Sequence, residues 1–439
     1  MSRSDYPQRT KHGSAANPRR IALDIITDVT EHGAYANLRI KDAVRGLSAQ
    51  DTAFTAALCY GTLEHLYYLD YIIDGFVKGR QKPVVRNLLR IGCCELLFLD
   101  TPSHAAIFET VSLCRAMGMN GLTGFVNAVL RRVDQARNSL PVLPEDTMQR
   151  LSIQYSCPHW LVALWTKELG LPDTEKLLAA ASPGLTVRAQ FPCTTDELAD
   201  ALPCPVRRGA LDDNALLLGR GFDFASHPAF SQGRMAIQSE GAMLLCRALG
   251  DCREKRVLDA CAAPGGKSAY IASLSENRAL LTCFEKHAHR IALMQKNFER
   301  LHVTADILLK DASEHDPEFD AAFDAVLLDV PCSGLGLLHE KPDVRYSKRE
   351  SDIESLAATQ HDILSACASY VRPGGILVYA TCTISKQENE MQVERFLKEH
   401  AEYSPDPLPF AFHSGHMLQL LPHRNGTDGF FVARMKRCI

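Results

Sequence analysis

Two cysteines that each follow an apolar strand are the residues of this chain best suited to chemistry. Cys332 lies in the segment AVLLDVPCSG (residues 325–334), and Cys382 lies in GILVYATCT (residues 375–383). A single cysteine in such a place usually packs as a small apolar residue, but two of them provide a pair of nucleophiles. A thiolate that adds to carbon 6 of a pyrimidine activates carbon 5, and Asp329 supplies an acid group for the ring. The pattern therefore indicates nucleophilic attack on a pyrimidine.

A loop of small residues follows a third apolar strand and is suited to a cofactor. In VLDACAAPGGK (residues 257–267), Ala262, Ala263, Gly265 and Gly266 keep the side chains short, so that a ligand can approach the backbone. Parallel sheets bind ligands beyond the carboxyl ends of their strands, where this loop lies. The dinucleotide fingerprint G-x-G-x-x-G is absent, and a plain strand–helix turn explains the loop by itself equally well.

Acidic residues lie at the ends of three successive strands. Glu285 ends the second strand of this region, Asp311 follows the third, and Asp329 ends the fourth. Because a carboxylate has two acceptor oxygens, Glu285 can accept both hydroxyls of a ribose. Asp311 is placed to receive an adenine amino group. Helix N-capping is the alternative role, but three acids in equivalent places favour a nucleoside-containing cofactor.

The elements that must hold these residues fall into three regions. Helical periodicity over 18–138 predicts a compact all-α bundle, with about six segments at 21–29, 54–66, 69–77, 84–97, 106–117 and 125–133. Residues 139–231 predict a linker and a small α/β region, with helices at 159–169, 173–181 and from Thr194, and strands at 186–190 and 206–211. From 232 to 439, strands alternate with helices, which predicts a Rossmann-like, doubly wound sheet with an antiparallel end. Its expected strands are 256–259, 279–284, 305–309, 325–328, 375–379, 417–421 and 429–435.

Composition limits the class of protein. The 439 residues are 46% hydrophobic and 23% charged, which is typical of two or three globular domains. No apolar run is long enough to cross a membrane, and the basic segment 1–17 reads as a disordered tail rather than a secretory signal. The 15 cysteines form no C-x-x-C pair, so we expect no metal site and a cytoplasmic location.

The distribution of charge offers a weak indication of a partner. The formal net charge is −4, which gives no general attraction to nucleic acid. Residues 1–140 nevertheless carry 17 Lys and Arg against 13 Asp and Glu. This local excess fits RNA capture by the first region, and an ordinary solvated surface explains it equally well.

The chain resembles the Sun/Fmu-type RNA cytosine-C5 methyltransferases. The resemblance is carried by DACAAPGGK (259–267), LDVPCSG (328–334), YATCTI (379–384), KQENE (386–390) and DGFF (428–431). It implies that S-adenosyl-L-methionine is the cofactor, that Cys382 is the nucleophile, and that Cys332 assists product release. DNA cytosine methyltransferases use the Pro-Cys cysteine instead, and having both cysteines favours the RNA type. The implied cofactor residues are Cys261, Ala262, Ala263, Pro264, Gly265, Gly266, Lys267, Glu285, Asp311 and Asp329.

The first region resembles the NusB family of RNA-binding proteins. RIAL (20–23), LRIGCCEL (89–96) and FVNAVLRR (125–132) carry this second resemblance. One departure from the methyltransferase pattern lies before the core, where QSEGA (238–242) replaces the usual Gln-Asp-x-Ala-Ser. It puts a packing or substrate contact in doubt.

Together these observations predict a monomeric enzyme that methylates carbon 5 of a cytosine in small-subunit (16S) ribosomal RNA. The base must be exposed or flipped out, because carbon 6 is stacked within a helix. Transfer RNA is the alternative substrate, and a non-catalytic NusB-like scaffold is the alternative class of protein. Lys341, Arg345, Lys348 and Arg349 are expected either to hold phosphates or to form a solvated helix face.

Overall fold

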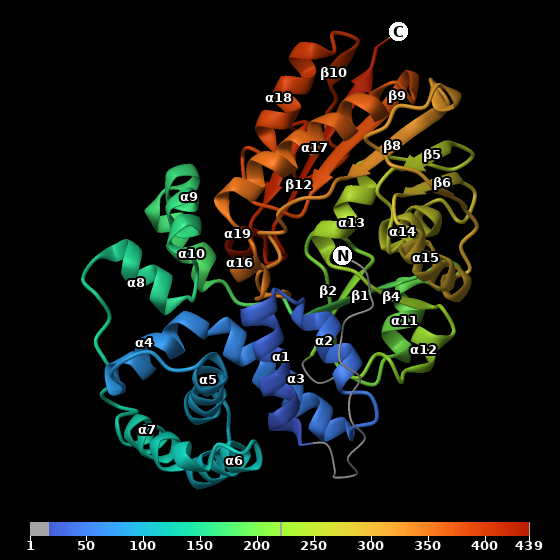
Figure 1. The fold of residues 1–439 in the computed structure, drawn as a ribbon. Coiled ribbons are helices and arrows are strands. Elements are labelled where there is room, and N and C mark those ends of the chain that lie inside the picture. The colour runs from blue at the N-terminus through green and yellow to red at the C-terminus, as the bar shows by residue number, and fades with distance from the viewer. Residues whose placement is uncertain (1–16, 220–221, 439) are drawn as a thin grey trace. The chain divides into compact units, whose positions relative to one another are not determined.

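A computed structural model describes residues 17–219 and 222–438, and the chain forms two compact units (Figure 1). The first unit contains residues up to 159 together with 341–347, and the second contains the remainder. The tail expected over 1–17 lies outside the described residues except for Asn17. Within the described part of the chain, no helix is both long and apolar enough to cross a bilayer.

The first unit is a helical bundle, as the periodicity predicts. Asn17 caps α1 by accepting hydrogen bonds from the backbone amides of Arg19 and Arg20. Apolar residues three and four positions apart then form a buried face, such as Ile21, Ile25 and Val29 of α1. The helices are α1 (Pro18–His32), α2 (Ala36–Ala43), α3 (Ala49–Glu64), α4 (Leu66–Phe76), α5 (Pro83–Phe98), α6 (Ser103–Ala116), η1 (Asn120–Leu122), α7 (Thr123–Gln135), α8 (Thr147–Gln154) and α16 (Val344–Ser347).

Helix α16 belongs to this unit although it follows the Cys332 segment (325–334) in the sequence. The hydroxyl of Tyr346 donates to the carbonyl of Leu63 at 2.7 Å, and a carboxylate oxygen of Asp343 accepts from the amide of Ala36 at 3.4 Å. Both contacts satisfy buried polar groups. The segment after Cys332 is therefore packed into the helical bundle over residues 341–347.

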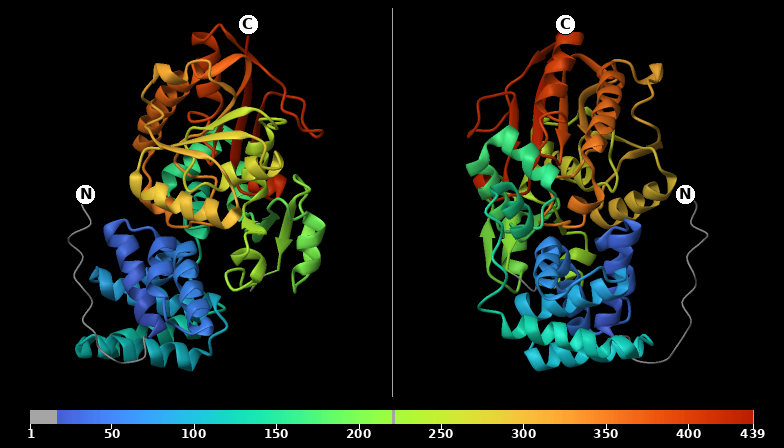
Figure 2. Two further views of the ribbon diagram at one scale, coloured as in Figure 1. Left: turned by 90° about the vertical axis from the view of Figure 1, so that its right-hand side faces the viewer. Right: turned by 60° about the vertical axis from the view of Figure 1, so that its left-hand side comes forward.

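The second unit begins with α9 (His159–Leu169) and α10 (Leu171–Ala179) and continues into a small antiparallel sheet. Its strand order is β2-β3-β1-β4, and α11 and α12 pack on its apolar face (Figure 2). The predicted capping box is present, because Thr194 and Glu197 exchange both hydrogen bonds. The elements are β1 (Leu185–Ala189), α11 (Thr195–Ala201), β2 (Val206–Arg208), β3 (Ala215–Leu218), α12 (Pro228–Ser231) and β4 (Met235–Ile237).

The larger sheet of this unit has the order β10-β12-β9-β8-β5-β6-β7, with β11 also paired to β12. The strands from β9 to β7 in this order are parallel, and β12 is antiparallel to all its neighbours. This arrangement confirms the predicted doubly wound sheet with an antiparallel end. The strands are β5 (Arg256–Asp259), β6 (Leu280–Glu285), β7 (Asp306–Leu309), β8 (Phe323–Asp329), β9 (Val371–Thr381), β10 (Tyr403–Pro405), β11 (Met417–Leu420) and β12 (Phe430–Arg437).

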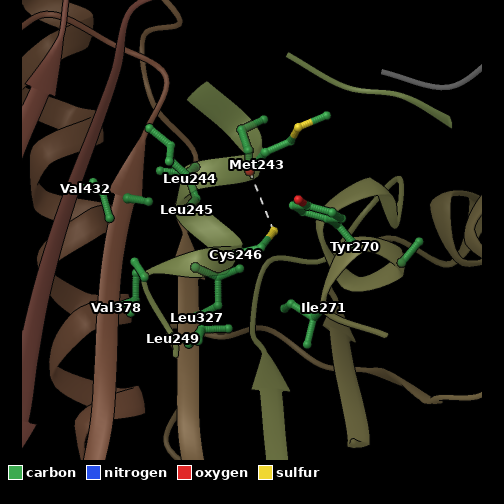
Figure 3. Close-up of a cluster of buried hydrophobic side chains, with 14 of the residues drawn as sticks. Met243, Leu244, Leu245, Cys246, Leu249, Tyr270, Ile271, Leu327, Val378 and Val432 are labelled. Carbon is green, nitrogen blue, oxygen red and sulfur yellow. Dashed lines mark hydrogen bonds between the residues drawn. The ribbon is translucent and has the colours of Figure 1, made fainter. Parts of the chain in front are cut away.

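Helices cover both faces of the larger sheet, so alternate strand residues enter two separate cores. Leu327, Val378 and Val432 face Leu245 and neighbouring residues of α13 on one side (Figure 3). Their sequence neighbours face α17 and α18 on the other side. Burial on both faces explains why these strands are continuous apolar runs. The helices are α13 (Glu240–Arg247), α14 (Gly266–Leu274), α15 (Ala288–Leu301), η2 (Pro317–Phe319), α17 (Glu350–Ala368), α18 (Glu390–Glu399) and α19 (Pro422–Asn425).

Several short elements escaped the sequence prediction, among them α2, α8, β3, β4 and β10. Helix α2 has no side-chain cap and buries only Ala36 and Ile40, so its local signal is weak. The three strands have three or four residues each, too few for a clear alternation. Strand β4 lies beyond residue 231 but pairs with β1 of the small sheet.

Candidate active site

The two cysteines meet because their strands are parallel neighbours. Strands β8 and β9 run side by side, with Asp329 paired to Ala380 at their carboxyl ends. The Sγ atoms of Cys332 and Cys382 lie 3.1 Å apart, and the backbone amide of Cys382 donates to Cys332 Sγ at 3.3 Å. All 15 cysteines are free thiols. The geometry thus gives a hydrogen-bonded thiol pair at the edge of the sheet where ligands bind.

Two glycines allow the loop after Cys332 to approach Cys382. The amide of Gly336 donates to the carbonyl of Cys382 at 3.0 Å, and the amide of Gly429 donates to the carbonyl of Gly336 at 2.9 Å. A Cβ atom on Gly336 would lie 2.0 Å from the carbonyl oxygen of Gly429. Only glycine permits this contact, which explains the small residues in both sequence segments.

Burial and the neighbouring sulfur act on the protonation of Cys332. The hydrogen bond with Cys382 and the burial of the side chain raise the pKa of Cys332 well above its ordinary value of 9.0. Cys332 is therefore a neutral thiol at neutral pH, and either sulfur can be the donor in the contact between them.

Lys267 and Asp329 form an ion pair beside the thiols. Lys267 Nζ lies 2.6 Å from an oxygen of Asp329, and each side chain is about one-fifth exposed. Burial opposes the charge of Lys267, but the Asp329 carboxylate outweighs this and raises its pKa, with a smaller contribution from Cys382. Lys267 is therefore a fixed cation, and an ammonium near a thiol favours the thiolate.

A cavity of about 270 Å³ adjoins the thiol pair. Apolar residues such as Phe284 and Ile363 and the ends of several strands line it. Of the predicted site residues, those that line the cavity are Cys261, Ala263, Glu285, Asp311, Asp329, Cys332 and Cys382. Ala262, Pro264, Gly265, Gly266 and Lys267 are not among its lining residues.

These remaining loop residues shape the turn and connect it to the core. Ala262 is buried, and its amide donates to the carbonyl of Phe284 at 3.1 Å. Gly265 has a φ of +95°, and a Cβ atom there would lie 2.6 Å from the ring of Phe298. Lys267 acts on the site through Asp329. The loop therefore contributes chiefly by its backbone course.

Sequence reasoning missed the cations that hold the cavity's acids. Arg290 pairs with Glu285 at 3.2 Å, and the Glu285 carboxylate also accepts from the amide of His287 at 2.7 Å. Lys286 pairs with Asp311 at 2.7 Å. Burial alone would raise the pKa of Asp311, but hydrogen bonds from Lys286 and Ser313 lower it to about 2. The position of Lys286, directly after the predicted Glu285, was the available signal.

Comparisons with known proteins agree along the whole chain. Residues 247–436 match the family described as 16S rRNA methyltransferase RsmB/F, and residues 16–135 match the NusB family. The probable ribosomal RNA small subunit methyltransferase B of Bacillus subtilis is 36% identical, over 95% of this chain and 98% of its own length. Ribosomal RNA small subunit methyltransferase B of Shewanella oneidensis is 33% identical, over 95% and 99%.

The chain belongs to the ribosomal RNA small subunit methyltransferase B family. Solved structures show the same fold. The crystal structure of PH0851 matches with a TM-score of 0.80 at 24% identity, covering 96% of this chain and 99% of that chain. NSun6 from Pyrococcus horikoshii with SFG matches with a TM-score of 0.58 at 19% identity, covering 64% and 98%.

The methyl donor of this methyltransferase family is S-adenosylmethionine, and the cavity residues fit it. Glu285 is 4% exposed at the end of β6, and the hydrogen bond from His287 and the ion pair with Arg290 leave lone pairs for ribose hydroxyls. Cys261 and Ala263 line one wall of the cavity with short side chains, so a ligand can reach the backbone. Among the described residues, His, Cys, Asp and Glu side chains form no group of three or more suited to a metal ion.

Arg345 and the segment 238–242 both lie outside the cavity. Arg345 is buried and donates to the carbonyls of Tyr155 and Ser156 at 2.9 and 3.4 Å, so the expectation that it holds phosphates is wrong.

The departure from the family pattern at 238–242 is a matter of packing. Glu240 is buried and accepts hydrogen bonds from the amides of Leu211 and Asp212.

Proposed function

We propose that this enzyme methylates carbon 5 of a cytosine in 16S ribosomal RNA through a covalent bond between Cys382 and carbon 6. The observation that carries the proposal is the 3.1 Å contact between Cys332 and Cys382 at the carboxyl ends of the parallel strands β8 and β9. The name of the matching family, 16S rRNA methyltransferase, supports the class of substrate. Membership of a methyltransferase family also disfavours the non-catalytic scaffold.

The chemistry assigns a separate step to each thiol. The Cys382 thiolate adds to carbon 6, and carbon 5 then takes the methyl group of S-adenosylmethionine. Cys332 serves after the transfer as the base or proton relay: it releases its own proton to solvent and takes the carbon-5 proton. The electrons of the broken carbon–hydrogen bond re-form the ring double bond, which expels the Cys382 thiolate. Asp329, whose carboxylate is held by Lys267, is the acidic residue proposed to contact the ring nitrogen.

Single-cysteine variants test these assignments. We expect Cys382→Ala to abolish both methyl transfer and the covalent RNA adduct. In Cys332→Ala, Cys382 should still attack carbon 6 and the base should be methylated once, but the enzyme should remain covalently bound to its product. Denaturing gels with RNA and cofactor should therefore show a slowly migrating band for Cys332→Ala only. The reverse pattern would make Cys332 the nucleophile, and bisulfite sequencing of RNA from a deletion strain would identify the modified molecule.

The NusB-like region, residues 18–138, is proposed to contribute RNA affinity and no chemistry. A hollow of about 670 Å³ between α6 and α7 is lined by Phe108, Arg115, Asn127 and Arg131, among others. Phe108 is 66% exposed, and both arginines are exposed. An exposed aromatic ring beside arginines suits single-stranded RNA, because the ring stacks a base while the guanidinium groups bind phosphates.

A further inference from the structure

Glu388 is fully buried and contacts the residues that follow both thiols. One carboxylate oxygen accepts from the amide of Ser333 at 2.8 Å, and the other accepts from the Ser333 hydroxyl at 2.5 Å and the Thr383 hydroxyl at 3.3 Å. These two hydroxyl oxygens lie 2.7 Å apart. Because Ser333 follows Cys332 and Thr383 follows Cys382, a single carboxylate joins the two cysteine-bearing segments.

The negative charge of Glu388 has no cationic partner among the described residues. Its remaining donor is the side-chain amide of Gln360, at 3.0 Å, which also donates to the carbonyl of Pro331 at 2.9 Å. A buried carboxylate without a cation is costly and requires several hydrogen bonds to persist. A neutral side chain would fill the same space with a smaller loss of solvation free energy, so we expect the charge of Glu388 to have a role.

The neighbouring Asn389 fixes the Cys382 segment from the same loop. Its side-chain oxygen accepts from the Thr381 hydroxyl at 2.6 Å, and its side-chain nitrogen donates to the carbonyl of Thr383 at 3.1 Å. The Tyr379 hydroxyl donates to the carbonyl of Glu388 at 2.6 Å. Residues on both sides of Cys382 are therefore held by 388 and 389, which are themselves anchored to β9.

We propose that Glu388 is the positioning residue of the thiol pair, which sets the separation of the two sulfur atoms by joining their segments and distinguishes the two thiols by its buried charge. The inference rests on the proposed function and explains how its two thiols are differentiated. After the hydrogen bond with Cys382 and burial, the charge of Glu388 is among the causes that raise the pKa of Cys332. A thiolate on Cys332 would be repelled by Glu388, whereas a negative charge on Cys382 is attracted by the Lys267 cation, as its contribution to the pKa of Lys267 indicates.

Glu388→Gln removes the charge with little change in shape, and Glu394→Gln on the exposed side of α18 is the matched control. The first readout is the alkylation of each thiol by iodoacetamide between about pH 6 and 10, followed by peptide mass spectrometry. We expect Cys332 of Glu388→Gln to react at lower pH than in the parent protein. In single turnover with 16S ribosomal RNA, the methyl-transfer rate should fall by about 10- to 100-fold, with KM for RNA within about twofold.

Two further variants keep the test decisive. Glu388→Asp retains the charge, so the pH profile of Cys332 alkylation should be close to that of the parent. Its methyl-transfer rate should stay further below the parent's. Ser333→Ala removes the hydroxyl that contacts both Glu388 and Thr383 and should lower the methyl-transfer rate as Glu388→Gln does, which covers the case in which Glu388→Gln does not fold. A parent-like Cys332 alkylation profile and rate in folded Glu388→Gln, or a parent-like rate in Ser333→Ala where Glu388→Gln does not fold, would overturn the role of Glu388. Adduct formation by Cys382→Ala would instead overturn the proposed function, and thiol alkylation does not depend on that outcome.

Discussion

Lys267 Nζ lies 2.6 Å from Asp329, which ties the cofactor loop at the start of α14 to the strand that leads to Cys332. The two residues are 62 positions apart and come from different motifs. Their pairing joins the segment expected to bind the methyl donor to the segment that carries one of the thiols. A change in either residue is therefore expected to affect both halves of the site.

Lys267→Met should lower the free energy of unfolding by about 1–3 kcal/mol, because it leaves the Asp329 carboxylate largely buried and unpaired. The double variant Lys267→Met/Asp329→Asn should recover part of this loss, since the unpaired charge is gone. Urea denaturation of the parent, the two single variants and the double variant measures the coupling. Strictly additive losses would show that the ion pair contributes no coupling energy.

Glu285→Ala should weaken S-adenosylmethionine binding by about 1.5–3 kcal/mol without unfolding the core, because charge-assisted hydrogen bonds to ribose are lost. Calorimetric titration of the purified enzyme measures the affinity. Glu299→Ala, an exposed position on α15, is the control and should bind like the parent. Unchanged affinity in folded Glu285→Ala would remove Glu285 from the cofactor site.

Substitutions in the α6–α7 hollow should separate stacking from charge. Phe108→Ala should weaken RNA binding by about 1–3 kcal/mol without changing its salt dependence, since a base loses its stacking partner. Arg115→Gln and Arg131→Gln should each reduce the slope of log affinity against log salt by about 0.7. Filter binding at several salt concentrations measures both quantities.

The control for the hollow is Arg45→Gln, which changes an exposed arginine that is not among its lining residues. The whole chain must be used, because residues 341–347 are packed into the first unit and removing that unit would expose Tyr346 and Arg345. RNA affinity in Phe108→Ala equal to that of the parent would assign the hollow another role.

Asp259 should make the enzyme less stable as the pH rises from about 4 to 6. Burial raises its pKa to about 6 from an ordinary value of 3.8, with Ser268 donating to the carboxylate at 2.6 Å. The folded state therefore binds this proton more tightly than the unfolded chain does. The stability that this provides is present below pH 4 and is lost as the pH passes 6, a change of about 3 kcal/mol.

Asp259→Asn should remove this part of the pH dependence, because the amide does not titrate. Its free energy of unfolding relative to the parent should rise between pH 4 and 6 and then level off, as measured by urea denaturation at each pH. Asp362→Asn, an exposed position on α17, should leave the parent's profile unchanged. A constant difference between Asp259→Asn and the parent across this range would contradict the shift.

Local pattern was enough to predict the strand ends and the residues placed on them. Cys332, Cys382, Glu285 and Asp329 each follow a continuous apolar run, and such runs mark strands buried on both faces. The parallel order then brings the carboxyl ends to one edge. The chemical types at that edge, two thiols and three acids, were therefore readable from the sequence, and their roles in catalysis stay predictions.

Local apolar pattern is enough to place these residues at one edge of the sheet, because strand periodicity and the parallel order follow from it. How the residues pair with one another depends on the packing of the whole fold. The contact between Cys332 and Cys382, the Lys267–Asp329 ion pair and the Glu388 hydrogen bonds all join positions remote in sequence. The same holds for the burial of Arg345 in the helical unit. Hydrogen bonds and ion pairs are sensitive to differences in distance of a few tenths of an ångström. These distances are set by packing between elements rather than by any one segment.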